Sequence, residues 1–162
     1  MGAVIQRAWR RSRMYRILTF NGYVAFNVPR FVTALGSVLL LALAAVHAYV
    51  LVTTTPVPPY FTVYCAALIT GCVCAVVAIG PAVKHVLPQH GWRLGGLVCV
   101  LYVGVYLATR AVSLPAVAAL TGRWDFAPGT LAFACAGGFI ALYGSVLVGI
   151  NVAYPQRQDW RD

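Results

Sequence analysis

The chain of 162 residues lacks glutamate altogether and contains only three aspartates and a single lysine. Asp125, Asp159 and Asp162 all lie outside the long apolar stretches of the sequence. General acid–base catalysis and proton relays through a membrane usually require paired carboxylates within one site. This shortage argues against a primary pump, an ion-coupled transporter and an enzyme that uses two carboxylates.

Other signatures of enzymes and cofactor proteins are missing too. The sequence has no glycine-rich phosphate loop, no nucleophile matched with a base, and no cluster of metal ligands at a recognised spacing. Its Cys72-Val73-Cys74 segment differs from the CxxC spacing of redox dithiols. We therefore expect a protein that is not an enzyme and that has no catalytic, cofactor or metal site.

Charged residues make up only 9% of the chain, whereas apolar residues make up 61%. A soluble domain carries about 25% charged residues. Four apolar stretches cover residues 31–53, 60–80, 94–113 and 127–152, and each is long enough to cross a hydrocarbon core of about 30 Å. They lack the alternation of polar and apolar residues found in membrane barrels. The sequence predicts an all-α membrane protein whose residues 31–153 form a four-helix transmembrane bundle.

The basic residues predict how this bundle is oriented. Of the twelve, ten lie at the two ends of the chain and between the second and third stretches: Arg7, Arg10, Arg11, Arg13, Arg16, Arg30, Lys84, Arg93, Arg157 and Arg161. Only Arg110 and Arg123 fall on the opposite side. Because short loops rich in Lys and Arg stay in the cytoplasm, we expect both termini to be cytoplasmic in the inner (plasma) membrane. Trp92 is expected at the cytoplasmic interface and Trp124 at the outer one, where amphipathic rings are enriched.

Residues 1–30 form a basic N-terminal arm, and residues 154–162 form a short cytoplasmic tail. A helix over residues 3–12 would have Trp9 on an apolar side and Arg7 and Arg10 on the other, as in segments that lie in the membrane interface. The arm residues expected to contact lipid or a partner are Arg7, Trp9, Arg10, Arg11, Arg13 and Arg16. A solvated tail that only orients the first span is the other reading. Since this charge lies beside membrane spans, anionic lipid and not nucleic acid is the expected counter-charge.

Small residues recur at steps of four along the apolar stretches. The fourth stretch has Gly137, Ala141, Ser145 and Gly149, the second has Ala67, Gly71 and Ala75, and the third has Gly104 and Ala108. Such faces let two helices approach closely in lipid. They predict either packing within the bundle or contact with an external helix of a partner protein.

Arg110 is the one basic residue within an apolar stretch, near its outer end. One interpretation is a side chain that extends to lipid phosphate or pairs with Asp125. The other is a site for an anionic headgroup formed by Arg110, Arg123 and Asp125, because charges within a membrane are costly and often functional.

His47 lies in the outer half of the first stretch, and His85 and His90 lie on the opposite side of the membrane. A single histidine is more often a hydrogen-bonded core residue than a ligand of haem or metal. The five cysteines all lie within the stretches and are expected to pack as small apolar residues. A disulfide between Cys65 and Cys135 is a minor alternative.

Residues Leu107–Pro115 read Leu-Ala-Thr-Arg-Ala-Val-Ser-Leu-Pro, and residues 124–129 read Trp-Asp-Phe-Ala-Pro-Gly. With His47 in the first span, this order resembles that of small four-helix integral membrane proteins of actinobacteria. The resemblance covers part of the chain and implies the four-helix fold, but no established activity. The Arg-rich arm before Asn27 departs from that group.

The expected function is that of a non-enzymatic accessory or assembly subunit of a larger inner-membrane complex, either a transporter or a respiratory enzyme. It would bind through the small-residue faces and the basic arm, with membrane lipid as a further partner. The alternative is a small transporter or lipid-binding module that recognises an anionic headgroup through Arg110. A second alternative is a haem or redox subunit that uses His47.

Overall fold

The computed structural model describes residues 29–54, 58–80, 87–112, 122, 124–148, 151 and 153. The N-terminal arm up to residue 28, the tail from residue 154, Arg123 and Gly149 lie outside these residues. Predictions that concern them therefore stay predictions.

Four α-helices make up the described part of the chain: α3 (Pro29–Thr53), α4 (Pro59–Ile79), α5 (Leu87–Ala111) and α6 (Ala127–Leu147). Each is long and apolar enough to cross a membrane, so the prediction of four transmembrane helices is confirmed at this level. Proline stands in the first turn of α4 and of α6. Its missing N–H group is tolerated there because that turn has no intrahelical acceptor.

Two helix boundaries differ from the sequence prediction. Helix α5 begins at Leu87 and not near Leu94, because Pro88 and Trp92 are buried against the bundle although polar residues surround them. Helix α6 ends at Leu147 and not at Val152. Beyond it, the backbone N–H of Asn151 donates a hydrogen bond to the carbonyl of Ser145 at 3.2 Å.

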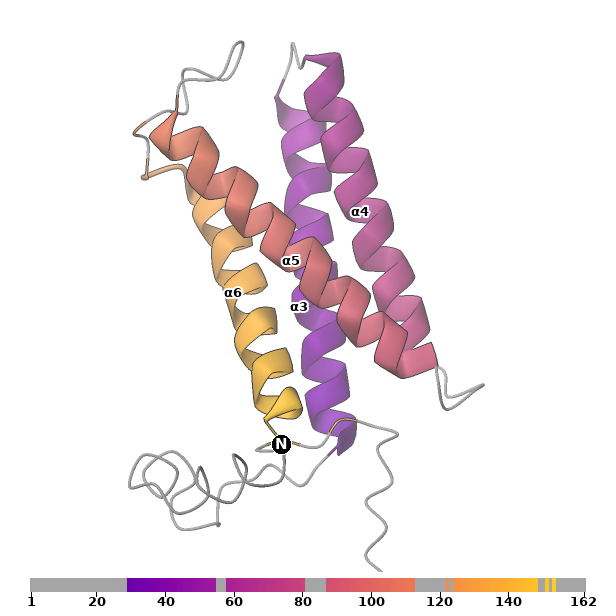
Figure 1. Cartoon of the computed structure of the whole chain (residues 1–162). Coiled ribbons are helices and arrows are strands. Elements are labelled where there is room, and N and C mark those ends of the chain that lie inside the picture. The colour runs from indigo at the N-terminus through magenta and orange to yellow at the C-terminus, as the bar shows by residue number, and fades with distance from the viewer. Residues whose placement is uncertain are drawn as a thin grey trace, which may run out of the picture.

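The helices form an antiparallel bundle in which α3, α4, α5 and α6 follow one another around a ring and α6 packs back on α3 (Figure 1). We call the end at which α3 stops and α4 begins the Thr54 end, and the opposite end the Gly80 end. Helix α5 crosses the bundle obliquely: it lies beside α4 at the Gly80 end and beside α6 at the Thr54 end (Figure 1). Helices α4 and α5 therefore diverge toward the Thr54 end.

Glycines facing aromatic rings build the core near the Gly80 end. A Cβ on Gly36 would lie 2.7 Å from the Trp92 ring, and one on Gly95 would lie 2.7 Å from the Phe139 ring. The two rings stack with centroids 5.3 Å apart. Trp92 is only 4% exposed, because the small residues opposite it leave room for the ring inside the bundle. Its expected level at the cytoplasmic membrane interface stays a prediction.

Helices α4 and α5 also contact each other at the Gly80 end, here partly through backbone atoms. A Cβ on Gly91 would lie 2.9 Å from the backbone nitrogen of Ile79 and 3.0 Å from the carbonyl oxygen of Ala75. Backbone atoms cannot move aside as a flexible side chain can, so the contact depends on glycine. This contact holds α4 and α5 together at the Gly80 end, from which they diverge toward the Thr54 end.

Candidate functional site

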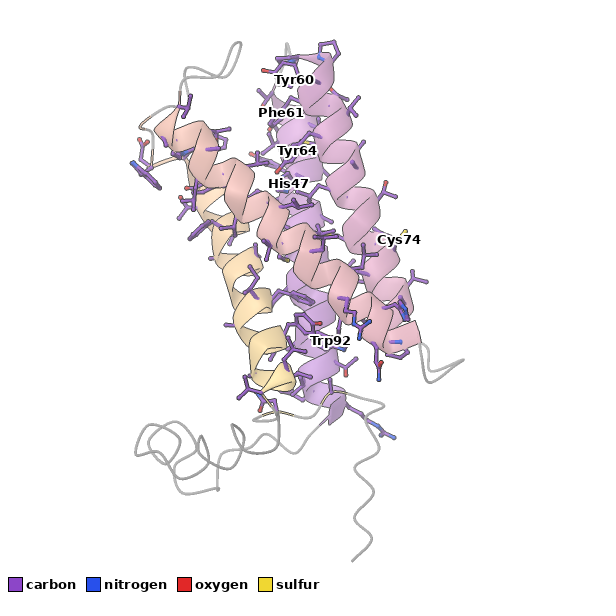
Figure 2. The ribbon with its side chains drawn as sticks, viewed as in Figure 1. His47, Tyr60, Phe61, Tyr64, Cys74 and Trp92 are labelled. Carbon is purple, nitrogen blue, oxygen red and sulfur yellow. The ribbon has the colours of Figure 1, made fainter. Side chains whose placement is uncertain are left out.

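A partly open cavity of about 260 Å³ occupies the region between the helices at the Thr54 end. All four helices contribute to its wall, which consists of Val46, His47, Val50, Tyr60, Phe61, Tyr64, Tyr102, Val105, Tyr106, Thr109, Arg110, Phe126, Pro128, Gly129 and Ala132. Its volume is near the lower limit of about 300 Å³ for small-molecule pockets. In Figure 2 the labelled side chains of Tyr60, Phe61, Tyr64 and His47 follow one another from the Thr54 end into the bundle.

Arg110, in the last turn of α5, supplies the charge of this cavity. Its guanidinium carbon lies 4.7 Å from the centre of the Tyr106 ring, a distance at which the ring attracts the cation. The residue is only 5% exposed. The Tyr106 ring and the cavity thus hold the guanidinium inside the bundle. The two partners predicted for this side chain, a lipid phosphate and Asp125, stay predictions.

Gly129, in the first turns of α6, leaves the room in which Arg110 lies. A Cβ at this position would lie 3.2 Å from Nη2 of Arg110 and 3.1 Å from the rings of Tyr106 and Phe126. The Gly129 carbonyl accepts a hydrogen bond from the Tyr102 hydroxyl at 3.1 Å. One glycine thus provides both space for the cation and an acceptor for a neighbouring tyrosine.

Residues that follow α5 in the sequence lie near the Arg110 end of that helix. The backbone N–H of Gly122 donates to the Arg110 carbonyl at 3.2 Å, and Gly122 has a φ of 74°, a conformation that favours glycine. Asp125 follows in the turn before α6 and is exposed. The turn therefore lies close to the end of α5, so two of the three residues predicted for a headgroup site, Arg110 and Asp125, fall at the Thr54 end.

His47 and Tyr64 form the deeper wall of the cavity. His47 is 7% exposed, and its Nδ1 lies 2.8 Å from the Leu43 carbonyl oxygen. Since a carbonyl only accepts, Nδ1 carries the proton and donates it, which leaves Nε2 as an acceptor in the neutral ring. The imidazole meets the Tyr102 ring edge to face at 5.1 Å and the Tyr64 ring at 6.2 Å.

The electrostatics of the cavity are simple. Among the described residues that line it, Arg110 is the only one with a permanent charge, and the others are aromatic or aliphatic apart from a few polar groups. A cation in such an apolar setting interacts with an anion far more strongly than it would in water. The arrangement is suited to bind a negatively charged group attached to an apolar body.

Other candidate residues lie away from the cavity. On α4, Ala75 is buried and Gly71 approaches Val98 of α5, whereas Ala67 is exposed. This stripe therefore packs partly within the bundle. Gly104 of α5 has no neighbouring atom within 4 Å of a Cβ added there, and Ala108 is exposed, so this pair takes no part in internal packing.

On α6, the small residues Gly137 and Ala141 lie on the outside of the bundle. A Cβ on Gly137 would meet nothing within 4 Å, and Ala141 is exposed. Ser145 accepts a hydrogen bond from the Asn151 amide at 2.8 Å. Gly137 and Ala141 thus leave a shallow apolar face on the outside of the helix.

The described residues contain no group of three or more His, Cys, Asp or Glu residues that could hold a metal ion. The five cysteines are free, so the disulfide considered between Cys65 and Cys135 is not formed. His90 is exposed at the Gly80 end, away from His47.

Sequence reasoning singled out Arg110 but missed the residues around it. Tyr102, Tyr106 and Arg110 recur at steps of four, a spacing that places them on one face of a helix. That spacing was a usable signal for the Arg110–Tyr106 contact. Gly129 entered only through the resemblance over residues 124–129 and not as a site residue, because its role depends on how α6 packs against α5.

No known family model, no curated protein and no solved structure matches this chain. The resemblance to the actinobacterial four-helix proteins therefore stays a prediction. Conclusions about function rest on the cavity and on the residues that line it.

Proposed function

We propose that the protein is a small lipid-binding module that holds an anionic amphiphile in the cavity beside Arg110. The observation that carries this proposal is a permanent cation, 5% exposed, in the wall of an otherwise apolar and aromatic cavity. The guanidinium lies over the Tyr106 ring, and a charge-assisted hydrogen bond to a bound anion would add to that attraction.

The proposal also concerns where the ligand comes from. Under the positive-inside rule the Thr54 end lies on the outer side of the membrane, since the basic residues gather at the other end. The cavity is partly open, and α4 and α5 diverge around it. A lipid of the outer leaflet can then place its headgroup near Arg110 while its chains remain in the hydrocarbon. A free aqueous anion has no apolar part that could pack against the aromatic walls.

Purification in mild detergent followed by native mass spectrometry tests this proposal, with phosphatidylglycerol added as the probe. The unaltered protein should retain the lipid, and Arg110→Gln should weaken retention at least about tenfold, because a charge-assisted hydrogen bond is worth about 1.5–3 kcal/mol. Arg110→Lys, which keeps the charge but loses the planar donor group, should fall between the two. Arg93→Gln is the matched control, as it removes the same charge from an exposed position at the other end of α5.

Equal retention by the unaltered protein, Arg110→Gln and Arg93→Gln would contradict the proposal. A fall caused equally by both glutamine variants would indicate general surface attraction and would contradict it as well. Thermal unfolding of each variant in the same detergent separates loss of binding from loss of fold.

A second candidate function is that of an accessory or assembly subunit, and the exposed face of Gly137 and Ala141 favours it. A small face on a lipid-exposed helix allows another helix to approach closely. Gly137→Leu should then abolish co-purification of a stoichiometric membrane partner, while Gly104→Leu, on another open surface, should not. A protein that purifies without any stoichiometric partner would contradict this function. A haem role for His47 remains a prediction, which an absorbance spectrum without a Soret band would contradict.

A further inference from the structure

The Tyr64 side chain carries a buried polar group, its hydroxyl. It is buried and has no hydrogen-bond partner among the described residues, although the Tyr64 ring lines the cavity. A buried hydroxyl without a partner destabilises a protein relative to one that is hydrogen-bonded. Native structures contain few such groups, and each one requires a physical explanation.

Neighbouring polar groups in the wall are already engaged. The Tyr102 hydroxyl donates to the Gly129 carbonyl, and the Thr109 hydroxyl donates to the Tyr106 carbonyl at 2.8 Å. His47 donates through Nδ1 to Leu43. Tyr64 therefore differs from these three groups in having a donor that is buried, close to the cavity and unused.

Tyr64 and Arg110 line the same cavity from two neighbouring helices, α4 and α5. The Tyr64 ring adjoins that of His47 at 6.2 Å, and the His47 ring in turn adjoins that of Tyr102 at 5.1 Å. The cavity thus presents a cation on one helix and a neutral hydrogen-bond donor on the next.

We propose that the ligand is a diacyl glycerophospholipid, with its phosphate near Arg110 and an ester carbonyl that accepts a hydrogen bond from the Tyr64 hydroxyl. This inference rests on the proposed function and identifies the class of lipid. In such lipids the ester carbonyls lie a few bonds from the phosphate, so one molecule offers both an anion and a neutral acceptor to the two groups that line the cavity. A fatty acid has only one polar group, and an ether-linked lipid has no carbonyl at this place.

The hydroxyl is covered, whereas the ring itself is only partly buried. The oxygen lies on the axis of ring rotation, so it reaches the ligand through a change of the χ1 rotamer toward the cavity. Binding then supplies the missing acceptor, and the gain is available only to a lipid with a carbonyl within reach of the hydroxyl.

The test compares two probes that share headgroup and chain length: diacyl phosphatidylglycerol and its 1,2-di-O-alkyl analogue. The unaltered protein should retain the ester lipid about fivefold more strongly, the effect of one neutral hydrogen bond. Tyr64→Phe should bind both lipids equally, at the level of the ether lipid. Tyr49→Phe is the matched control, because Tyr49 lies at the same end, is 60% exposed and does not line the cavity.

Each outcome bears on a different claim. Equal binding of ester and ether lipids by the unaltered protein overturns this inference, and the proposed function survives if binding still depends on Arg110. An ester preference that persists in Tyr64→Phe also overturns it. Binding that is independent of Arg110 overturns the proposed function itself.

Discussion

At the scale of single residues, Gly129 decides where the charge of the cavity lies. A methyl group at this position would press on Nη2 of Arg110 and on the rings of Tyr106 and Phe126. Three contacts at 3.1–3.2 Å cannot all be relieved by moving one side chain. The position of the cation thus depends on the absence of a side chain on a different helix.

We therefore predict that Gly129→Ala destabilises the fold by about 1–3 kcal/mol, as overpacking in a core does, and weakens retention of anionic lipid. Gly104→Ala is the control, because a Cβ there meets nothing within 4 Å. It should leave retention unchanged. Thermal unfolding and native mass spectrometry in one detergent measure both effects. Unchanged retention in Gly129→Ala would show that Arg110 does not need its present position.

Two tyrosines of the cavity wall should respond in opposite ways to loss of the hydroxyl. Tyr102→Phe leaves the Gly129 carbonyl without its donor and should lower stability by about 1 kcal/mol. Tyr64→Phe removes a hydroxyl that has no partner, so lipid-free protein should be as stable as before or more stable. Melting temperatures of delipidated samples make the comparison. A marked loss of stability in Tyr64→Phe would mean that its hydroxyl has a partner.

At the scale of helices, the pair α4 and α5 is joined by backbone contact and not by side chains alone. A Cβ added to Gly91 would lie 2.9–3.0 Å from backbone atoms of Ile79 and Ala75, whereas ordinary van der Waals contact begins at 3.4 Å. No rearrangement of rotamers relieves that clash. The whole helix has to move.

We predict that Gly91→Ala destabilises the bundle more than Gly137→Ala, which places the same methyl group in open space on α6. The first change should cost about 1–3 kcal/mol, whereas the second should be neutral or stabilise α6 by up to about 1 kcal/mol. Thermal unfolding in detergent measures both. Similar melting temperatures for the two variants would contradict the tight joint between α4 and α5.

The same helices show which boundaries can be read from sequence. The start of α4 at Pro59 follows from proline, which breaks the preceding helix and is tolerated in a first turn. The start of α5 could not be read in this way. The polar side chains of His90 and Arg93 lower the hydropathy there, while Trp92 between them is buried by residues of distant helices, among them Gly36 and Phe139.

At the scale of the whole molecule, the four spans could be predicted because their length and apolar content are properties of the chain alone. The cavity could not. It exists because α4 and α5 diverge, and the crossing angle of two helices is determined by contacts between residues far apart in the sequence. Arg110 could be singled out by its charge, whereas its inward direction depends on Tyr106 and Gly129 together.

The orientation of the molecule is the remaining prediction from charge. Fusions of alkaline phosphatase, which is active only outside the cytoplasm, should be active after residue 58 and inactive after residues 84 and 162. The imbalance of ten basic residues against two is the physical reason. The reverse pattern of activity would place the cavity on the cytoplasmic side and would contradict the proposed source of its ligand.

The contact at Gly91 has a consequence for the distant end of the same helix. Gly91 and Arg110 are nineteen residues apart on α5, a lever arm of about 28 Å. A tilt of about 5° about the Gly91 contact would displace the Arg110 end of α5 by about 2.5 Å. If α5 tilts about this contact, a glycine at the Gly80 end determines the separation of α4 and α5 at the Thr54 end.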